Sequence, residues 1–331
     1  MSDAVETIEV TGGDAGQRLD RWFRQHFPDV THGRLQKLLR TGQIRVDSKR
    51  AQANTRLERG QAIRVPKAVR LPPERKPSLK PPPGLSKADR TYIERMILFE
   101  DADVLVLNKP AGIAVQGGTK TKRHIDGLLA GMADRFGGER PRLVHRLDRE
   151  TSGVLLVAKS RSVAAKLGRT FQTRSAAKTY WALVHGVPKP RQGKVEAALV
   201  KAPTPDGDRV RKAEAGEQAR AQHAATHYAV IDQVAQKAAW MSLKPVTGRQ
   251  HQLRAHMDLI GCPIVGDSKY GSRPLPDVDM PMVLHLHARR LVVPHPVRGL
   301  PDIDVTAPMP DHMLTTWDLL GLDPHRFDAD V

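Results

Sequence analysis

The sequence of 331 residues is poor in cysteine and in long apolar runs, and both shortages exclude classes of protein. Cys262 is its one cysteine, so an internal disulfide framework and a cysteine-rich zinc module are excluded. No apolar stretch approaches the roughly 20 residues that a membrane-spanning helix needs. The first residues, MSDAVETIEV, are acidic, unlike the basic start of a signal peptide. We therefore expect a protein of the reducing cytoplasm with no membrane partner.

Negative charge is also scarce. The chain has 53 Lys and Arg residues against 36 Asp and Glu residues, a formal net charge of +17. An excess of one sign on this scale indicates a polyanionic partner, which could be RNA, DNA or an acidic membrane. Solubility alone rarely requires so large a bias, so nucleic acid is the favoured partner.

Signatures of nucleotide and metal sites are missing. Residues 117–124, GGTKTKRH, lack the GxxxxGK[ST] spacing of a phosphate-binding loop and are interpreted as a basic loop. HRLD at 145–148 differs from the kinase HRD motif by the displaced Asp. His251 and His256 are five residues apart, about 140° around a helix, so they do not share a face. We expect neither a metal nor a cofactor.

Proline marks the clearest boundary in the chain. Seven prolines lie between positions 66 and 83, which forbids a regular helix or a central strand there. The sequence therefore predicts a small domain at 1–66, an extended basic linker at 67–90 and a large domain at 91–331.

The small domain has a readable pattern of helices and strands. Leu19, Trp22, Phe23 and Phe27 recur at helical spacing, which predicts a first helix with one apolar face. Thr31 is a candidate N-cap for a second helix that ends near Gly42. The stretches QIRVDSKRA and GQAIRV then alternate like strands, and Asp47-Ser48 forms a turn in the first.

This order of elements resembles the S4 RNA-binding domain. The matching residues are RLD at 18–20, RLQKLLRTG at 34–42 and I-x-V-D at 44–47 in place of the usual V-x-V-N-G. Between residues 17 and 66 there are 12 Lys and Arg against 4 Asp and Glu. Helix-borne cations follow phosphates by charge, so five residues are candidate RNA contacts. They are Arg34, Lys37, Arg40, Lys49 and Arg50. The alternative is a small basic domain with a solvated face.

The large domain alternates short apolar runs with Gly and Pro. Strands are predicted at 104–112, 153–160, 179–186, 226–234 and 239–246. Helices are predicted near 124–136, 161–174 and 249–260. Because strands outnumber helices and come in runs, the pattern favours an α+β domain with a mixed, largely antiparallel sheet.

Three stretches of this domain combine into one signature. HRLDRETSG at 145–153 is followed by KTYWALV at 178–184 and TGRQHQLRAH at 247–256. These resemble the successive motifs of the RluA/RluC/RluD family of pseudouridine synthases, and most closely the C-type enzyme that acts on large-subunit ribosomal RNA. NKPAG, GDSKYG and LHLHARRL resemble the secondary signatures of the family, in the same order. The resemblance implies the pseudouridine synthase fold. It also implies an enzyme that isomerises uridine in RNA without a cofactor.

The resemblance also implies roles for individual residues. Asp148 matches the catalytic aspartate, and Arg254 matches the arginine that pairs with it. Leu253 matches a residue that packs against the base. Tyr180 matches the tyrosine that stacks on the uracil and helps to remove the C5 proton. Arg146 matches the arginine that fills the vacated stack or holds the flipped nucleotide. Each of these residues also has an ordinary structural alternative; Asp148, for example, could simply be a turn residue.

We therefore expect an enzyme that acts on uridines of 23S ribosomal RNA, as a monomer. Two alternatives stay open at this point: a synthase that acts on tRNA or another RNA, and a non-catalytic RNA-binding factor of ribosome assembly. The residues also leave three roles open for Asp148, which could attack C1′, attack C6 of the base, or deprotonate C2′ to form a glycal. Lys109 of NKPAG is expected to be structural or to contact a phosphate.

Overall fold

A computed structural model of the chain describes residues 5–66, 69, 85–118, 121, 123–204, 209–271, 274–275 and 278–327. The chain forms two compact units, Met1–Pro81 and Pro82–Val331. Most of the predicted linker, residues 67–68 and 70–84, lies outside the described residues. The end of that prediction is wrong, because helix α3 (Lys87–Glu94) begins inside it where the Ser86 side chain accepts a hydrogen bond from the Asp89 N–H.

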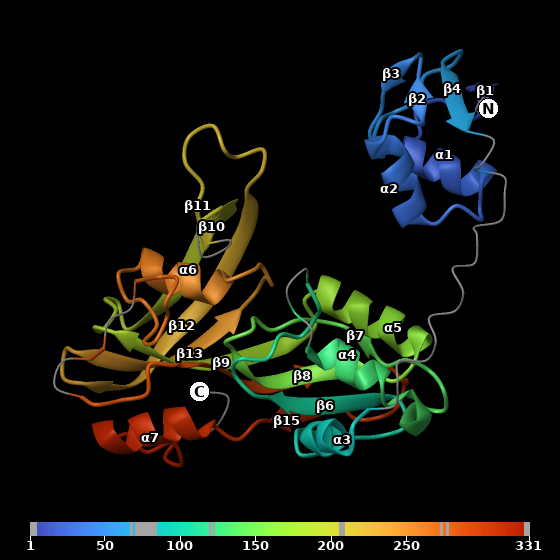
Figure 1. The fold of residues 1–331 in the computed structure, drawn as a ribbon. Coiled ribbons are helices and arrows are strands. Elements are labelled where there is room, and N and C mark those ends of the chain that lie inside the picture. The colour runs from blue at the N-terminus through green and yellow to red at the C-terminus, as the bar shows by residue number, and fades with distance from the viewer. Residues whose placement is uncertain are drawn as a thin grey trace. The chain divides into compact units, whose positions relative to one another are not determined.

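The small unit packs two helices against a four-stranded sheet (Figure 1). Its elements are β1 (Val5–Glu9), α1 (Leu19–His26), α2 (His32–Arg40), β2 (Arg45–Val46), β3 (Lys49–Arg50) and β4 (Ala62–Pro66), and the strand order is β1-β4-β2-β3. Both predicted helices are present, Thr31 caps α2, and Trp22 and Phe23 are buried in the core. Asp47 and Ser48 both have positive φ, as a tight hairpin turn requires. Strand β1 was not predicted.

The large unit is built on an 11-stranded sheet within the described residues. Its strands are β5 (Ile97–Glu100), β6 (Val104–Lys109), β7 (Arg142–Leu143), β8 (Ser152–Ala158), β9 (Ala177–His185), β10 (Gln192–Ala202), β11 (Arg209–Lys212), β12 (Gln222–Val234), β13 (Ala238–Pro245), β14 (Leu286–Val293) and β15 (Ile303–Thr306). The main path runs β11-β10-β12-β13-β9-β14-β8-β6-β5, and only the described pair β14–β8 is parallel. The predicted mixed, largely antiparallel α+β fold is confirmed.

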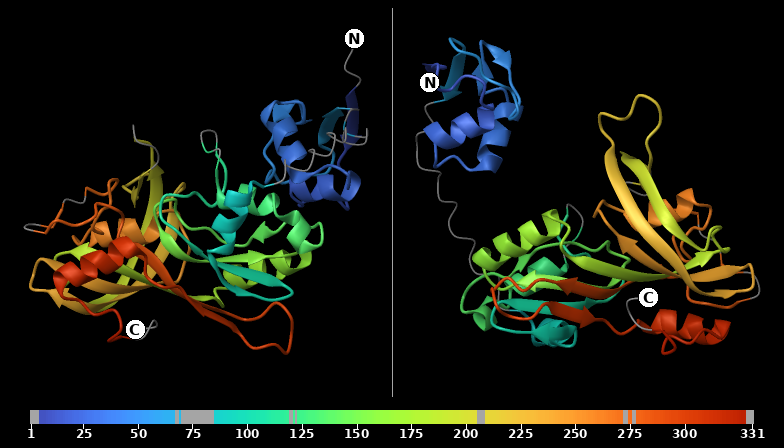
Figure 2. Two further views of the ribbon diagram at one scale, coloured as in Figure 1. Left: turned by 60° about the horizontal axis from the view of Figure 1, so that its bottom comes forward. Right: turned by 180° about the vertical axis from the view of Figure 1, so that it is seen from behind.

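Helices cover both faces of this sheet (Figure 2). They are α3, α4 (Ile125–Ala130), α5 (Arg161–Gln172), α6 (Gln252–Leu259) and α7 (Asp311–Leu320), with a 3₁₀ turn at Ala133–Phe136. Alternate residues of β8 point to opposite faces, so Leu155 and Val157 pack with α3 and α4 while Leu156 packs with α5. None of the helices among the described residues has the length and apolarity needed to cross a bilayer.

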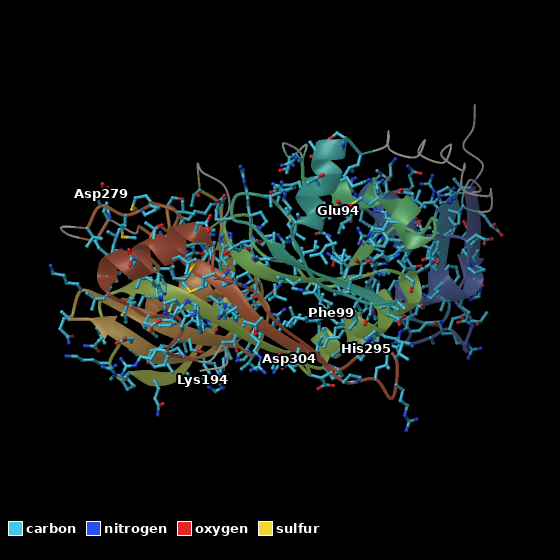
Figure 3. The ribbon with its side chains drawn as sticks, turned by 90° about the horizontal axis from the view of Figure 1, so that it is seen from below. Glu94, Phe99, Lys194, Asp279, His295 and Asp304 are labelled. Carbon is cyan, nitrogen blue, oxygen red and sulfur yellow. The ribbon has the colours of Figure 1, made fainter. Side chains whose placement is uncertain are left out.

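The half of the sheet that holds β9 and β13 is covered in the same way, with α6 on one face and α7 on the other. Lys194 of β10 and Asp279 lie toward one end of the large unit in Figure 3, and Phe99 of β5 and His295 lie toward the other. This arrangement matches the positions of β10 and β5 near opposite edges of the sheet.

The parallel pair β8–β14 explains the glycine of the TSG turn. Gly153 has a φ of 110° and pairs with Ala288. A Cβ atom at this position would lie 2.2 Å from the Ala288 carbonyl oxygen, which is backbone and cannot move aside. Only glycine therefore lets β14 approach the start of β8.

Two histidines, the partly buried His145 and the buried His287, make hydrogen bonds to residues of β8. His145 Nε2 accepts a hydrogen bond of 2.8 Å from the Leu156 N–H, and its ring stacks on Phe171. His287 pairs with the Ser152 hydroxyl at 2.9 Å through Nδ1 and donates from Nε2 to the Ala307 carbonyl. Burial lowers the pKa of each imidazole to about 3, and the Lys178 charge adds to this effect at His145. Both rings are therefore neutral at pH 7.

We expect the large unit to lose stability as the pH falls from about 6.5 toward 3. In this window His145 and His287 bind protons in the unfolded state but not in the folded state. Each can therefore lower the free energy of unfolding by up to ~1.4 kcal/mol per pH unit. Urea unfolding at pH 7 and pH 5, followed by tryptophan fluorescence, measures the change. The variant His287→Gln should show a smaller dependence on pH than wild type, and the exposed control His325→Gln should not. Equal slopes in all three proteins would contradict the prediction.

Candidate active site

A cleft of about 560 Å³ opens in the large unit between the loop that precedes β8 and the segment that leads into α6. Tyr180 of β9 lines it and packs against two core clusters, one under α4 and one under α6. Because the side chains on one face of a strand lie on one face of the sheet, both clusters share a face and meet at Tyr180. The cleft therefore lies where the two halves of the sheet join.

The loop that carries Asp148 is held on both sides of that residue. Leu147 is buried in the core cluster under α4. The Arg149 carbonyl accepts hydrogen bonds from Lys109 Nζ at 3.0 Å and from the Gly112 N–H at 2.9 Å. The Asp148 carbonyl accepts one of 3.2 Å from the Thr151 N–H. The backbone is therefore fixed, and the carboxylate extends into the cleft with 19% of its side chain exposed.

Lys109 has a structural position. Its side chain is fully buried, and Nζ donates to the carbonyls of Pro110, Ile113 and Arg149 at 2.8 to 3.0 Å. Burial lowers the pKa of Lys109 to about 7, although the charges of Glu150 and Asp148 act in the opposite direction. With no surface exposed, Lys109 joins the NKPAG turn to the Asp148 loop and is out of reach of a phosphate.

The Asp148 carboxylate lies between two nitrogen-bearing side chains. Its Oδ2 is 4.0 Å from Arg254 Nη1 and 4.0 Å from His251 Nε2. No residue in the described part of the chain donates a hydrogen bond to this carboxylate. Its oxygens therefore remain available to a substrate.

Arg254 makes its two short hydrogen bonds to Asp267 rather than to Asp148. Nε and Nη2 reach the two carboxylate oxygens at 2.7 and 2.6 Å, and both side chains are buried. Burial alone would lower the pKa of Arg254, but its hydrogen bonds and charge pairing with Asp267 raise that pKa above its ordinary value. Sequence reasoning missed Asp267, although it stands in the GDSKYG stretch. Asp267 therefore orients the guanidinium that lies near Asp148.

The other residues predicted for the site also line the cleft. Leu253, on α6, is buried, and Arg146 is exposed beside Asp148. Burial raises the pKa of Tyr180 well above its usual value, and the Asp148 charge adds to this. The phenol of Tyr180 is therefore protonated at neutral pH.

The structure buries His251 next to Asp148. It begins α6 with φ 50° and ψ 20°, a left-handed conformation that is costly for a residue other than glycine. Its Nδ1 lies 3.5 Å from the Tyr270 hydroxyl. Burial lowers the pKa of His251, and the charge of Asp148 offsets this only in part. A neutral imidazole therefore faces the carboxylate.

The small unit has a basic hollow of its own, of about 890 Å³. Lys37 and Arg40 of α2 and Arg50 of β3 line it, together with Arg18, which the sequence did not single out. Arg34 and Lys49, the other two predicted RNA contacts, are not among the residues that line it. Cations from separate elements therefore converge on one concave surface, as a binding site for a phosphate backbone requires.

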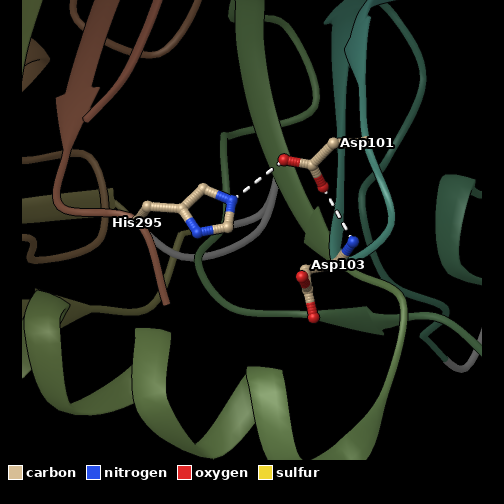
Figure 4. A group of neighbouring side chains, drawn as sticks. All are labelled: Asp101, Asp103 and His295. Atoms are coloured by element: carbon tan, nitrogen blue, oxygen red, sulfur yellow. Dashed lines mark hydrogen bonds and ion pairs between the residues drawn. The ribbon is translucent and has the colours of Figure 1, made fainter. Parts of the chain in front are cut away.

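One described group of side chains, Asp101, Asp103 and His295, has the spacing of a metal site (Figure 4). His295 Nδ1 accepts a hydrogen bond from the Val297 N–H, so Nε2 carries the proton and donates to Asp101 at 2.9 Å. The other Asp101 oxygen accepts from the backbone N–H groups of Asp103 and Val104. Neither imidazole nitrogen has a free lone pair, so the group ties β5–β6 to the segment after β14.

The fold and this site define an RNA pseudouridine synthase, and the chain belongs to that family. The family profile described as RNA pseudouridylate synthase matches residues 103–259, which include the Asp148 loop and α6. The chain is 35% identical to "Ribosomal large subunit pseudouridine synthase C" of Escherichia coli O157:H7, over 93% of this chain and 94% of that protein. It is 32% identical to "RNA pseudouridine synthase 4, mitochondrial" of Arabidopsis thaliana, over 91% and 78%.

Solved structures give the same result. The fold matches "Human RNA Pseudouridylate Synthase Domain Containing 4" with a TM-score of 0.58 and 30% sequence identity, over 70% of this chain and 95% of that one. The predicted family and the predicted reaction are confirmed, and the protein is an isomerase that forms pseudouridine in RNA.

Proposed function

We propose that this enzyme isomerises uridines of 23S ribosomal RNA, in the mature large subunit or its precursor, with Asp148 as the catalytic carboxylate. The catalytic role is supported by one observation. The Asp148 carboxylate extends into the cleft from an anchored loop, and none of the described residues donates a hydrogen bond to it. The RNA assignment is supported by relatives named as large-subunit synthases, including one from Rickettsia bellii that is 33% identical over 92% of this chain and 98% of its own length. The substrate implies a compartment that holds ribosomes, and we propose the cytoplasm.

The cleft supplies what the reaction requires. The C1′–N1 bond must break, the base must turn, C5 must join C1′, and C5 must then lose its proton. A uridine in folded RNA has to leave its stack to enter such a cleft, and Arg146, an exposed residue of the cleft lining, would hold the flipped nucleotide. Leu253 and the Tyr180 ring then hold the uracil. In this proposal the Tyr180 ring stacks on the uracil.

We also propose that the small unit is an S4-like domain that binds the RNA backbone through its basic hollow. Replacing Lys37, Arg40 and Arg50 together by Gln should weaken RNA binding. It should also reduce the slope of log affinity against log salt by about 2, since each lost phosphate contact removes roughly 0.7. Affinity measured between 50 and 300 mM salt tests this. The control replaces three exposed cations outside the hollow, Arg24, Arg59 and Arg64. An equal loss of slope in both variants would mean that the hollow has no special role.

A map of pseudouridines in 23S rRNA, 16S rRNA and tRNA tests the substrate. Cells that lack the gene are complemented with wild type or with Asp148→Asn. We expect sites in 23S rRNA to disappear without the gene and to return only with wild type. Loss confined to tRNA would overturn the rRNA assignment and keep the chemistry. Restoration by both versions, or no lost site at all, would favour a non-catalytic RNA-binding factor.

A further inference from the structure

The cleft contains a lysine, the first residue of KTYWALV, to which neither the motif comparison nor the proposed reaction has assigned a role. Lys178 lies two residues before Tyr180 in β9, the strand labelled in Figure 1. It lines the same cleft. Its side chain is partly buried, and burial lowers the pKa of its ammonium group. In the part of the chain that the structure describes, Nζ has no hydrogen-bond or ion-pair partner. A half-buried cation without an anion is costly, so its position calls for a ligand.

The surroundings of Lys178 indicate the charge of that ligand. Arg174 and Arg249 line the same cleft, and the nearby His145 is neutral because its Nε2 accepts the Leu156 N–H. Gly248 lies beside the ammonium: a Cβ atom, which glycine lacks, would be 4.0 Å from Lys178 Nζ at this position. No side chain of residue 248 therefore fills the space next to Nζ. Arg174, Lys178 and Arg249 therefore add positive charge to the lining of the cleft, which attracts an anion more than a neutral group.

We propose that Lys178 binds a backbone phosphate next to the uridine that occupies the cleft. This inference rests on the proposed function, since it assumes that an RNA nucleotide enters the cleft. Phosphate is the anionic group of unmodified RNA, and a lysine ammonium binds it as a point charge. The uracil carbonyls are the rival ligands, but a neutral oxygen would leave the partly buried ammonium of Lys178 without a counter-charge.

The contact gives Lys178 a positioning role. An ammonium inside the cleft can reach a phosphate only after the nucleotide has left its stack. Its interaction then favours the flipped state over the stacked state, so it should act on turnover more than on the affinity for RNA. Because the group is partly shielded from water, one such contact should change the rate by about 10- to 100-fold.

The test couples a protein change to a phosphate change. The substrate is a fragment of whichever RNA the map identifies, with one neutral methylphosphonate placed in turn at each linkage within two nucleotides of the target. The preceding nucleotide carries a 2′-O-methyl group to keep the linkage intact, and the reference has the same methyl group with an ordinary phosphate. Single-turnover rate and RNA affinity are both measured, and each is compared with that of the methylated reference at the same linkage.

We expect a methylphosphonate at one linkage to lower the single-turnover rate of wild type about 10-fold or more. Lys178→Met should have a similarly low rate on RNA with ordinary phosphates, and a methylphosphonate at that linkage should not lower its rate further. Lys178→Arg should keep most of the activity and the sensitivity. The control Lys166→Met, on α5, where Nζ donates to the Pro296 carbonyl, should behave as wild type. Unaltered turnover by Lys178→Met, or impairment that adds fully to that of the methylphosphonate, would overturn the phosphate contact. A map without any lost site would instead overturn the proposed function.

Discussion

Replacing Asp148 by Asn should abolish pseudouridine formation and leave the affinity for RNA within about twofold of wild type. The amide keeps the shape of the side chain but can act neither as a nucleophile nor as a base, so we expect the rate to fall by at least about a thousandfold. The loop should stay in place, because its anchors are Leu147 in the core and the Arg149 carbonyl. Single-turnover assays and filter binding on the same RNA measure the two quantities.

Glu150 provides a matched control for this experiment. It is a partly exposed carboxylate two residues from Asp148, and it pairs with Arg149 on the surface. Glu150→Gln removes the same charge from the same loop but from a side chain that does not line the cleft. It should retain nearly full activity. Turnover by Asp148→Asn close to that of Glu150→Gln would show that Asp148 is only a turn residue.

Replacing Arg254 by Ala should lower kcat by about a hundredfold or more, with a much smaller change in RNA affinity. The guanidinium is buried, and it lies 4.0 Å from the Asp148 carboxylate, where it acts on charge that changes during the reaction. Arg249→Ala is the contrasting control, because Arg249 is an exposed cation of the same cleft. It should weaken RNA binding more than turnover. A fall in affinity for Arg254→Ala without a fall in kcat would identify Arg254 as a backbone clamp.

Loss of Arg254 also leaves the buried Asp267 carboxylate without its partner, which costs about 3 to 5 kcal/mol of stability. The double variant Arg254→Ala, Asp267→Ala separates the two effects. Removing both charges should restore much of the thermal stability, because no unpaired charge is left inside. It should not restore turnover. Recovery of both together would mean that Arg254 serves the fold alone.

Local features of this protein followed directly from the sequence. Leu19, Trp22 and Phe23 recur with the period of a helix, and Thr31 caps the next helix, because periodicity and capping depend on residues a few positions apart. The weaker parts of the prediction were the segments without strong apolar alternation. Strands β10 and β14 were not predicted, since charged and small residues interrupt them and their positions depend on neighbouring strands.

The candidate site divides in the same way. The motif HRLDRETSG identified Asp148, and TGRQHQLRAH identified Arg254, because both carry unusual residue combinations over short distances. The partners of these residues could not be read from spacing. Arg254 lies 13 positions before Asp267 in sequence, and His251 reaches Asp148 across more than 100 residues. Those contacts depend on where α6 sits over β9 and β13.

The sequence by itself determined the family and the reaction, and it singled out Asp148 as the candidate catalytic residue, because these follow from local motifs and composition. The tertiary structure alone decided that Asp267 holds Arg254, that Lys178 has no ion-pair partner among the described residues, and that Arg18 joins Lys37, Arg40 and Arg50 around one hollow. The physical reason is the order of strands in the sheet. It brings together side chains from distant segments, and neither periodicity nor motif spacing contains that information.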